Sequence, residues 1–269
     1  RQMCIRDSVR RSSNVGTIMW AQESGATALH SKLVDFGLGQ VTGLRFPGEA
    51  HGILLPLAKW SGTSLPTIAI GQGVATTPIQ MLASYATLAN RRVQPATTLV
   101  LGMRDHGGVF EAVGNYMGRR VVSEATAEEL VVMMEEAVRS GTGTRAQVSG
   151  YRVAGKTGTA WKPYPAGGYG EEEDEVRYVA SFAGFLPADA PELVVLVIVD
   201  EPARHSYSGG RAAAPVFSEF SKFAVRQLRI PASEERIDPD MPELVMAATP
   251  VQALTATAAD QLAATDPVG

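Results

Sequence analysis

The sequence predicts a fold of the α/β (α+β) class, because it contains both segments with helical periodicity and segments with the composition of strands. Apolar residues recur at helical spacing in five segments: 15–21, 26–36, 78–89, 126–139 and 215–230. Strand-like composition marks three runs late in the chain: 151–161, 176–186 and 193–199. The chain of 269 residues is long enough for a large domain with a well-developed core.

Local signals predict where two of the helices begin and end. Thr77 followed by Pro78 is a typical N-cap with proline at the first helical position. Thr126, with Glu129 three residues later, predicts a capping box, and Gly141 ends the same helix. The residues expected to be buried are Met81, Leu82, Tyr85, Leu88 and Ala89 in the first helix and Leu130, Met133, Met134, Ala137 and Val138 in the second. In the last helix the predicted apolar side consists of Val216, Phe217, Phe220, Phe223, Ala224 and Leu228.

Three further segments have distinctive compositions. The run 193–199 is apolar throughout, which predicts a strand covered on both faces. The first eleven residues hold four arginines and show no amphipathic pattern, so we expect residues 1–8 to be a boundary or non-native segment. After Pro231 periodicity fades and alanine, threonine, proline and aspartate become frequent, so we expect 231–269 to be a flexible tail.

Composition and charge argue against several kinds of partner. A formal net charge of −4, from 24 basic and 28 acidic side chains, gives no basic surface for nucleic acid or anionic membranes. Cys4 is the single cysteine and the four histidines lack ligand spacing, so we expect no disulfide, no metal site and no cofactor. The longest apolar run has seven residues, far fewer than the roughly 20 that cross a bilayer.

The stretch VAGKTGTAWK places Lys156 among small residues, on backbone that suits close approach of an anionic ligand. With Gly150 it also fits the phosphate-loop pattern G-x-x-x-x-G-K-[ST], and Asp200 follows a strand-like run as a magnesium ligand would. That mechanism needs a strand before the loop and a helix after it. Here the residues 151–154 alternate like a strand, and glycines and prolines follow. Nucleotide binding is therefore a remote alternative.

A second motif, Ser12-Ser13-Asn14, precedes the first predicted helix, where such residues are also ordinary N-caps. Together with Lys156-Thr157-Gly158 it resembles the S-x-N and K-T-G motifs of penicillin-binding proteins and serine β-lactamases. The resemblance extends through FPGE, IAIGQG, TPIQM, YATLAN, DEP and YSGGRAAAPVF, and covers about residues 9–230. It is greatest to class B penicillin-binding proteins of the cell-division type. It implies a β-lactamase/transpeptidase-like fold, with an antiparallel sheet flanked by helices and incomplete at its N-terminal side.

The resemblance also implies a function and residue roles. The family's enzymes are peptidoglycan D,D-transpeptidases that cross-link stem peptides and are acylated by β-lactams. By similarity, Ser12 would help to carry the proton to the leaving amine, and Lys156 would supply positive potential near that path. Asn14 would hold the substrate's amide side chain and the catalytic lysine of the family. Thr157 and Thr159 would bind the substrate's terminal carboxylate. Gly158 would leave room for the acyl group beside the strand.

The sequence departs from the family pattern in one respect. The nucleophilic serine of the family lies in an S-x-x-K motif upstream of S-x-N, and no S-x-x-K occurs in these 269 residues. We therefore expect a C-terminal fragment of a transpeptidase that forms no acyl-enzyme as it stands. The alternative is a non-catalytic, penicillin-recognising scaffold protein. A β-lactamase is less favoured, because no E-x-x-L-N type deacylation motif lies between the two motifs.

The resemblance further implies partners and a location. Stem peptides and β-lactams would be the ligands, and division or cell-wall synthesis proteins would be the macromolecular partners. The location would be the cell envelope, on the extracytoplasmic side of the plasma membrane. Contact with the membrane would be made only through an N-terminal anchor that these residues do not include.

Overall fold

The structure is a computed structural model of the 269-residue chain. It describes residues 2–44, 46–91, 93–100, 102–112, 118–165, 168–169, 176–203 and 206–233. Residues Arg1–Ser233 form one compact unit. The predicted tail at 231–269 lies outside the described residues, apart from its first three positions.

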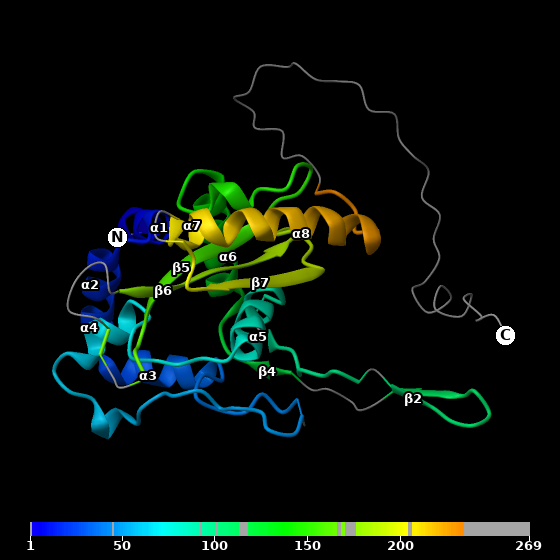
Figure 1. The fold of residues 1–269 in the computed structure, drawn as a ribbon, viewed down its shortest axis with the longest axis horizontal. Coiled ribbons are helices and arrows are strands. Elements are labelled where there is room, and N and C mark those ends of the chain that lie inside the picture. Colours follow the sequence, from blue (N-terminus) through cyan, green and yellow to red (C-terminus); the bar gives the residue numbers. More distant parts are fainter. Residues whose placement is uncertain are drawn as a thin grey trace, which may run out of the picture. The chain divides into compact units, whose positions relative to one another are not determined.

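Helices make up most of the regular structure (Figure 1). They are α1 (Gln2–Arg11), α2 (Asn14–Ser24), α3 (Ala26–Asp35), η1 (Leu57–Lys59), α4 (Ser64–Ala69), α5 (Pro78–Ala89), α6 (Glu124–Arg139), η2 (Thr144–Ala146), α7 (Gly209–Ala212) and α8 (Ala214–Gln227). The strands are β1 (Val93–Gln94), β2 (Gly102–Arg104), β3 (Phe110–Ala112), β4 (Arg119–Arg120), β5 (Ala154–Lys162), β6 (Arg177–Leu186) and β7 (Leu193–Asp200). Among the described residues, no helix is long and apolar enough to span a membrane.

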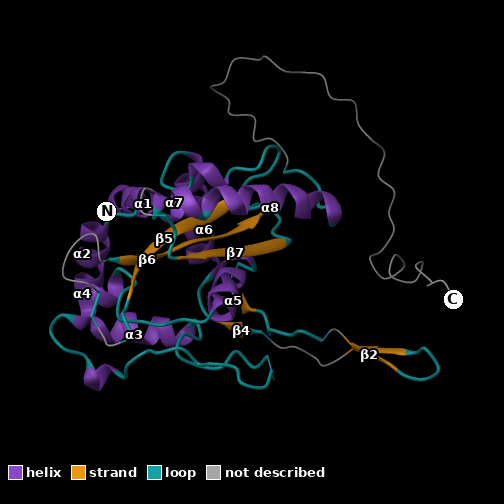
Figure 2. Cartoon of the chain, in the orientation of Figure 1, coloured by secondary structure: helices purple, strands orange, loops and turns teal. Residues whose placement is uncertain are grey.

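The main sheet is antiparallel, in the order β5-β6-β7, and has helices on both faces (Figure 2). This confirms the predicted α/β class and the antiparallel, helix-flanked sheet of a transpeptidase-like fold. In the segment of chain that follows α5 and precedes α6, β1 pairs with β4 and β2 pairs with β3, both antiparallel.

Alternation along β6 assigns its side chains to two cores. On one face, Phe182 and Leu186 pack toward α8, where the ring of Phe182 meets that of Phe217 edge-on with centroids 4.7 Å apart. On the other face, Phe185 packs with α5 and α6 residues, among them Met134. Both phenylalanines of β6 have no exposed surface. The central strand is therefore covered on both sides, and it positions β5 rigidly.

Several predicted helix boundaries are confirmed. Ser13 caps α2, and its hydroxyl accepts a hydrogen bond from the Gly16 amide at 3.1 Å. Thr77 caps α5 with Pro78 in its first turn, and Gln80 completes a capping box that the sequence prediction did not include. The buried positions of α5 are Gln80, Ala83, Thr87 and Ala89, so the predicted stripe is only partly correct.

Three predictions about elements are wrong, and one helix of this part was missed. Helix α6 begins at Glu124, because Ser123 rather than Thr126 is its N-cap, and the Ser123 hydroxyl accepts from the Thr126 amide. Helix α4 was not predicted. Strand β7 is not covered on both faces, because Ile198 is 46% exposed. The apolar residues of α8 divide between two faces: Phe217 and Ala224 are buried, whereas the exposed group consists of Val216, Phe220, Phe223 and Leu228.

Helix α1 was not predicted either, and it packs against α2 and α6. Its contact face includes Arg10, which is paired with Asp7 at 2.9 Å and lies beside the end of α6. An arginine on the packed face explains why apolar periodicity did not reveal the helix. Whether residues 1–8 are native to the protein stays a prediction.

Candidate active site

The Lys-Thr-Gly-Thr stretch lies in the middle of β5, at one edge of the three-stranded sheet. Lys156 is opposite Ala183 on β6, and Thr159 is opposite Ala180. Among the described strands β5 pairs only with β6, so its other edge has no strand partner.

The glycines of this stretch serve internal packing. A Cβ at Gly155 would lie 2.5 Å from Cζ of Phe182, and one at Gly158 would lie 2.4 Å from Oγ of Ser181. Both distances are shorter than van der Waals contact allows. At Gly155 the backbone oxygen of Ala183 is also only 2.9 Å away, so glycine is needed there, whereas at Gly158 the Ser181 hydroxyl would have to move. Packing against the neighbouring strand β6 therefore accounts for the glycines here.

The phosphate-loop interpretation is excluded by this geometry. Gly155, Lys156 and Thr157 are strand residues paired with β6, whereas a phosphate site needs a loop that opens a helix. The next described helix along the chain is α7, more than forty residues beyond Lys156.

The structure brings the two predicted motifs together. The Nζ of Lys156 donates a hydrogen bond to the Oγ of Ser12 at 2.8 Å, across 144 positions of sequence. Ser12 joins α1 to α2 with a φ of 55°, in the left-handed region that L residues rarely adopt. Because Ser13 caps α2, the hydroxyl of Ser12 is not needed for capping and can face the strand.

Asn14 is the first residue of α2 and its side chain is exposed. It lies two positions after Ser12, at the same end of α2. The structure thus places Ser12 against Lys156 and leaves Asn14 available to a ligand.

Lys156 is largely buried, and burial lowers its pKa from 10.5 to about 8. Its Nζ also donates to the carbonyl oxygen of Thr157 at 3.1 Å and to its Oγ1 at 3.3 Å. These acceptors, like Ser12, are uncharged. The protonated amine therefore gains no compensating negative charge from them, and an anionic ligand would supply it.

Two hydroxyl groups follow Lys156 along the strand. Thr157 Oγ1 lies 2.8 Å from Thr142 Oγ1, in the loop after α6. Thr159 Oγ1 accepts a hydrogen bond from the Gly209 amide, at the start of α7, at 3.1 Å. Because the amide occupies a lone pair of Thr159, the hydroxyl proton of Thr159 remains free to donate outward.

Thr142 and Gly209 were not predicted as part of the site. Gly209 lies within the stretch YSGGRAAAPVF that contributes to the family resemblance, and that stretch was the available signal. Thr142 follows the helix stop at Gly141 and carries no motif. Among the described residues, no cluster of three or more histidine, cysteine, aspartate or glutamate side chains could hold a metal ion.

The sequence matches the family described as "Penicillin binding protein transpeptidase domain" over residues 1–222. The match thus begins eight residues earlier than the resemblance seen in the motifs. The penicillin-binding protein PbpB of Mycolicibacterium smegmatis is 38% identical over 233 residues, which are 84% of this chain and 36% of that protein. Peptidoglycan D,D-transpeptidase FtsI of Escherichia coli K12 is 31% identical over 85% of this chain and 37% of its own length. This chain therefore spans little more than a third of these relatives.

Solved structures give the same similarity. Penicillin-binding protein 3 of Mycobacterium tuberculosis, in complex with ampicillin, has a TM-score of 0.78 and 34% identity. The alignment covers 91% of this chain and 54% of that chain. The transpeptidase domain of Burkholderia pseudomallei penicillin-binding protein 3 has a TM-score of 0.72 and 32% identity, over 88% of this chain and 66% of that one.

Proposed function

Because this chain belongs to the family of penicillin-binding protein transpeptidase domains, we propose that it forms two sides of a peptidoglycan D,D-transpeptidase active site. The observation that carries the proposal is the contact between Lys156 and Ser12, which joins the Lys-Thr-Gly strand to the Ser-x-Asn turn. The reaction would be acyl transfer from one stem peptide to an amine of another. Penicillins and related β-lactams would occupy the same site.

The first role concerns proton transfer. Ser12 accepts a hydrogen bond from Lys156, so the hydroxyl proton of Ser12 is left for donation to another acceptor. A lysine with a pKa of about 8 gives up its proton more readily than an ordinary lysine. The pair can therefore pass a proton to the amine that leaves when the peptide bond breaks.

The second role concerns the carboxylate at the end of the stem peptide. Thr157 and Thr159 present hydroxyl groups two residues apart on one strand, and the ammonium group of Lys156 lies beside them. Hydrogen bonds to a charged acceptor are stronger than neutral ones. We assign carboxylate binding to the two threonines, and the attraction of the anion to Lys156.

Asn14 and Gly158 have supporting roles in this proposal. Asn14 is exposed at the start of α2, where its amide can bind the amide groups of a peptide. Gly158 carries no side chain between the two threonines, and a Cβ there would meet the Ser181 hydroxyl. An acyl group can then lie along the strand edge.

The nucleophile is not among these residues, since no S-x-x-K occurs in the sequence. We expect the 269-residue chain to gain no mass when it is incubated with a fluorescent penicillin and its intact mass is measured. A stoichiometric adduct would show that another residue is acylated. A coding sequence upstream of Arg1 with an in-frame S-x-x-K would favour the enzyme, whereas a start codon near Arg1 would favour the non-catalytic, penicillin-recognising scaffold.

Binding of a stem-peptide mimic tests the site directly. Diacetyl-L-lysyl-D-alanyl-D-alanine should bind the chain, and its C-terminal amide should bind more weakly. Lys156→Met should weaken binding of the acid by at least about tenfold, as expected for a lost charged hydrogen bond. Lys162→Met is the matched control on β5, because Lys162 lies six positions along the strand and is paired with Asp200 at 2.7 Å and with Glu201 at 2.8 Å. Equal affinity for acid and amide in the unsubstituted chain would refute the proposal.

The location and partners follow from the same assignment. We propose that the protein acts in the cell envelope, on the extracytoplasmic side of the plasma membrane, where peptidoglycan is cross-linked. Relatives named stage V sporulation protein D and peptidoglycan D,D-transpeptidase FtsI support a role with division or other cell-wall synthesis proteins. Labelled protein should then collect at the septum.

A further inference from the structure

Thr142 contacts the end of α1, the K-T-G strand β5 and the start of α7. Its amide donates to the carbonyl oxygen of Arg10, two residues before Ser12, at 3.2 Å. Its hydroxyl lies 2.8 Å from that of Thr157. Its own carbonyl oxygen lies against Gly210, where a Cβ would be only 2.5 Å away. One residue therefore connects the end of α1, the β5 strand and α7.

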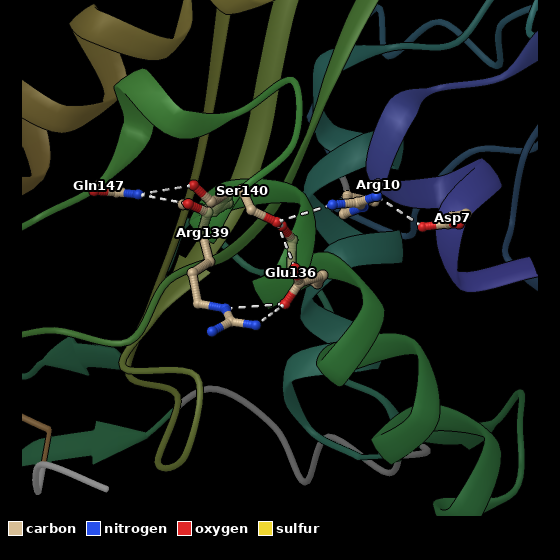
Figure 3. Close-up of polar contacts among 7 residues, drawn as sticks. Asp7, Arg10, Glu136, Arg139, Ser140 and Gln147 are labelled. Atoms are coloured by element: carbon tan, nitrogen blue, oxygen red, sulfur yellow. Dashed lines mark hydrogen bonds and ion pairs between the residues drawn. The ribbon is translucent and has the colours of Figure 1, made fainter. Parts of the chain in front are cut away.

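The loop that carries Thr142 is fixed on both sides by polar contacts (Figure 3). Before it, the Ser140 hydroxyl donates to Glu136, and Arg10 approaches the same hydroxyl at 3.5 Å. After it, the Gln147 side chain donates to the carbonyl oxygens of Val138 and Arg139 at 3.1 and 3.2 Å. Thr142 is thus held in place although it is exposed.

The chemistry of the ligand sets the direction of the hydrogen bond between the two threonines. A carboxylate only accepts hydrogen bonds, so Thr157 must donate its single hydroxyl proton to it. The Oγ1 of Thr157 is then left as an acceptor toward Thr142, which must be the donor. Without Thr142, the Thr157 hydroxyl would keep only the longer contact from Lys156 Nζ, at 3.3 Å, and would be less firmly oriented.

We propose that Thr142 is a positioning residue, whose hydroxyl donates to Thr157 and so orients the Thr157 hydroxyl toward the carboxylate of the substrate. The inference rests on the proposed function, because it assumes that Thr157 binds this carboxylate. It adds a residue outside the two motifs to the carboxylate site. The Arg10 contact also places this residue at a fixed distance from the Ser12 turn.

Two substitutions separate positioning from a purely structural role. Thr142→Val has nearly the same shape and lacks the donor, and Thr142→Ser keeps the donor. With diacetyl-L-lysyl-D-alanyl-D-alanine as the probe, Thr142→Val should weaken binding on the order of fivefold, and Thr142→Ser should restore it. Binding of the C-terminal amide should change little, and the melting temperatures of both variants should stay close to that of the unsubstituted chain.

Three-bond couplings of the Thr157 methyl group give a second readout that needs no ligand. They should report one χ1 rotamer in the unsubstituted chain and in Thr142→Ser, and averaging in Thr142→Val. The inference is overturned if Thr142→Val binds the acid as well as the unsubstituted chain does, or if it weakens acid and amide equally. If the unsubstituted chain fails to prefer the acid, the proposed function fails, and an unchanged Thr157 rotamer in Thr142→Val overturns the positioning role separately.

Discussion

The ammonium group of Lys156 and the hydroxyl of Ser12 form the one direct hydrogen bond that the described side chains make between the two motifs, at 2.8 Å. The strand supplies the charge and the interhelical turn supplies the acceptor. Their separate origins mean that the site forms only when α1, α2 and β5 are packed together.

Binding of an anionic ligand should depend on pH in one direction. The pKa of Lys156 is about 8 in the free protein, and a carboxylate beside it raises that pKa, so binding favours the protonated amine. The affinity for the stem-peptide acid should therefore fall as the pH rises above about 8. Calorimetric titrations between pH 6 and 10 measure this. Affinity that is constant over this range would contradict the assignment of Lys156 to the site.

Lys156 should also lower the stability of the ligand-free chain. The folded pKa of about 8 lies below the ordinary 10.5, so between these values the unfolded chain binds more protons and stability rises with pH. Lys156→Met removes this dependence. The variant should be the more stable protein at pH 7, and its advantage should shrink as the pH rises from 8 to 10.5. Thermal melts of both proteins across this range provide the measurement, and a difference independent of pH would be the contrary result.

The left-handed backbone conformation at Ser12 should make the folded chain less stable than it would be with glycine at this position. At a φ of 55° a residue with a Cβ is about 1 kcal/mol less stable than glycine. Ser12→Ala and Ser12→Gly both lose the hydroxyl, so their difference isolates the backbone. Urea unfolding should find Ser12→Gly the more stable of the two by about 1 kcal/mol. Equal stabilities would indicate that the left-handed turn is not kept in the variants.

The packing of α8 on the sheet predicts very different effects for two phenylalanines. Phe217 has no exposed surface and meets Phe182, so Phe217→Ala should lower the free energy of unfolding by about 3 to 5 kcal/mol. Phe223 on the same helix is 64% exposed, and Phe223→Ala should cost less than about 1 kcal/mol. Denaturant titration measures both values. Similar losses would mean that the outer side of α8 is also packed.

The sequence predicted those elements whose signals are local. The caps of α2 and α5 and the three strands of the main sheet are such cases, because a cap or an alternating run is complete within a few residues. The faces of α8 were not predictable in this way. Its apolar residues surround much of the helix, and only the tertiary structure selects Phe217 over Phe220 for burial.

The candidate site likewise combines residues that local sequence signals predict with residues that only the tertiary structure reveals. Ser12, Asn14 and Lys156 were named from motifs, and the structure adds the contact between the first and the last. Thr142 could not be named, because its relation to Thr157 depends on how the loop after α6 lies against β5. The glycines of β5 were predicted for openness to a ligand, and the structure instead explains them by Phe182 and Ser181.

Close packing also explains two glycines on the other side of the site, Gly209 and Gly210. A Cβ at Gly209 would lie 2.4 Å from the carbonyl oxygen of Gly158, and one at Gly210 would lie 2.5 Å from that of Thr142. On this side of the site, backbone atoms thus pack directly against backbone atoms. Natural variation can alter the hydroxyl-bearing residues stepwise, for instance from threonine to serine. At these two glycines even a single methyl group would clash with the backbone. Among descendants of this protein, they should therefore be the positions that change most slowly.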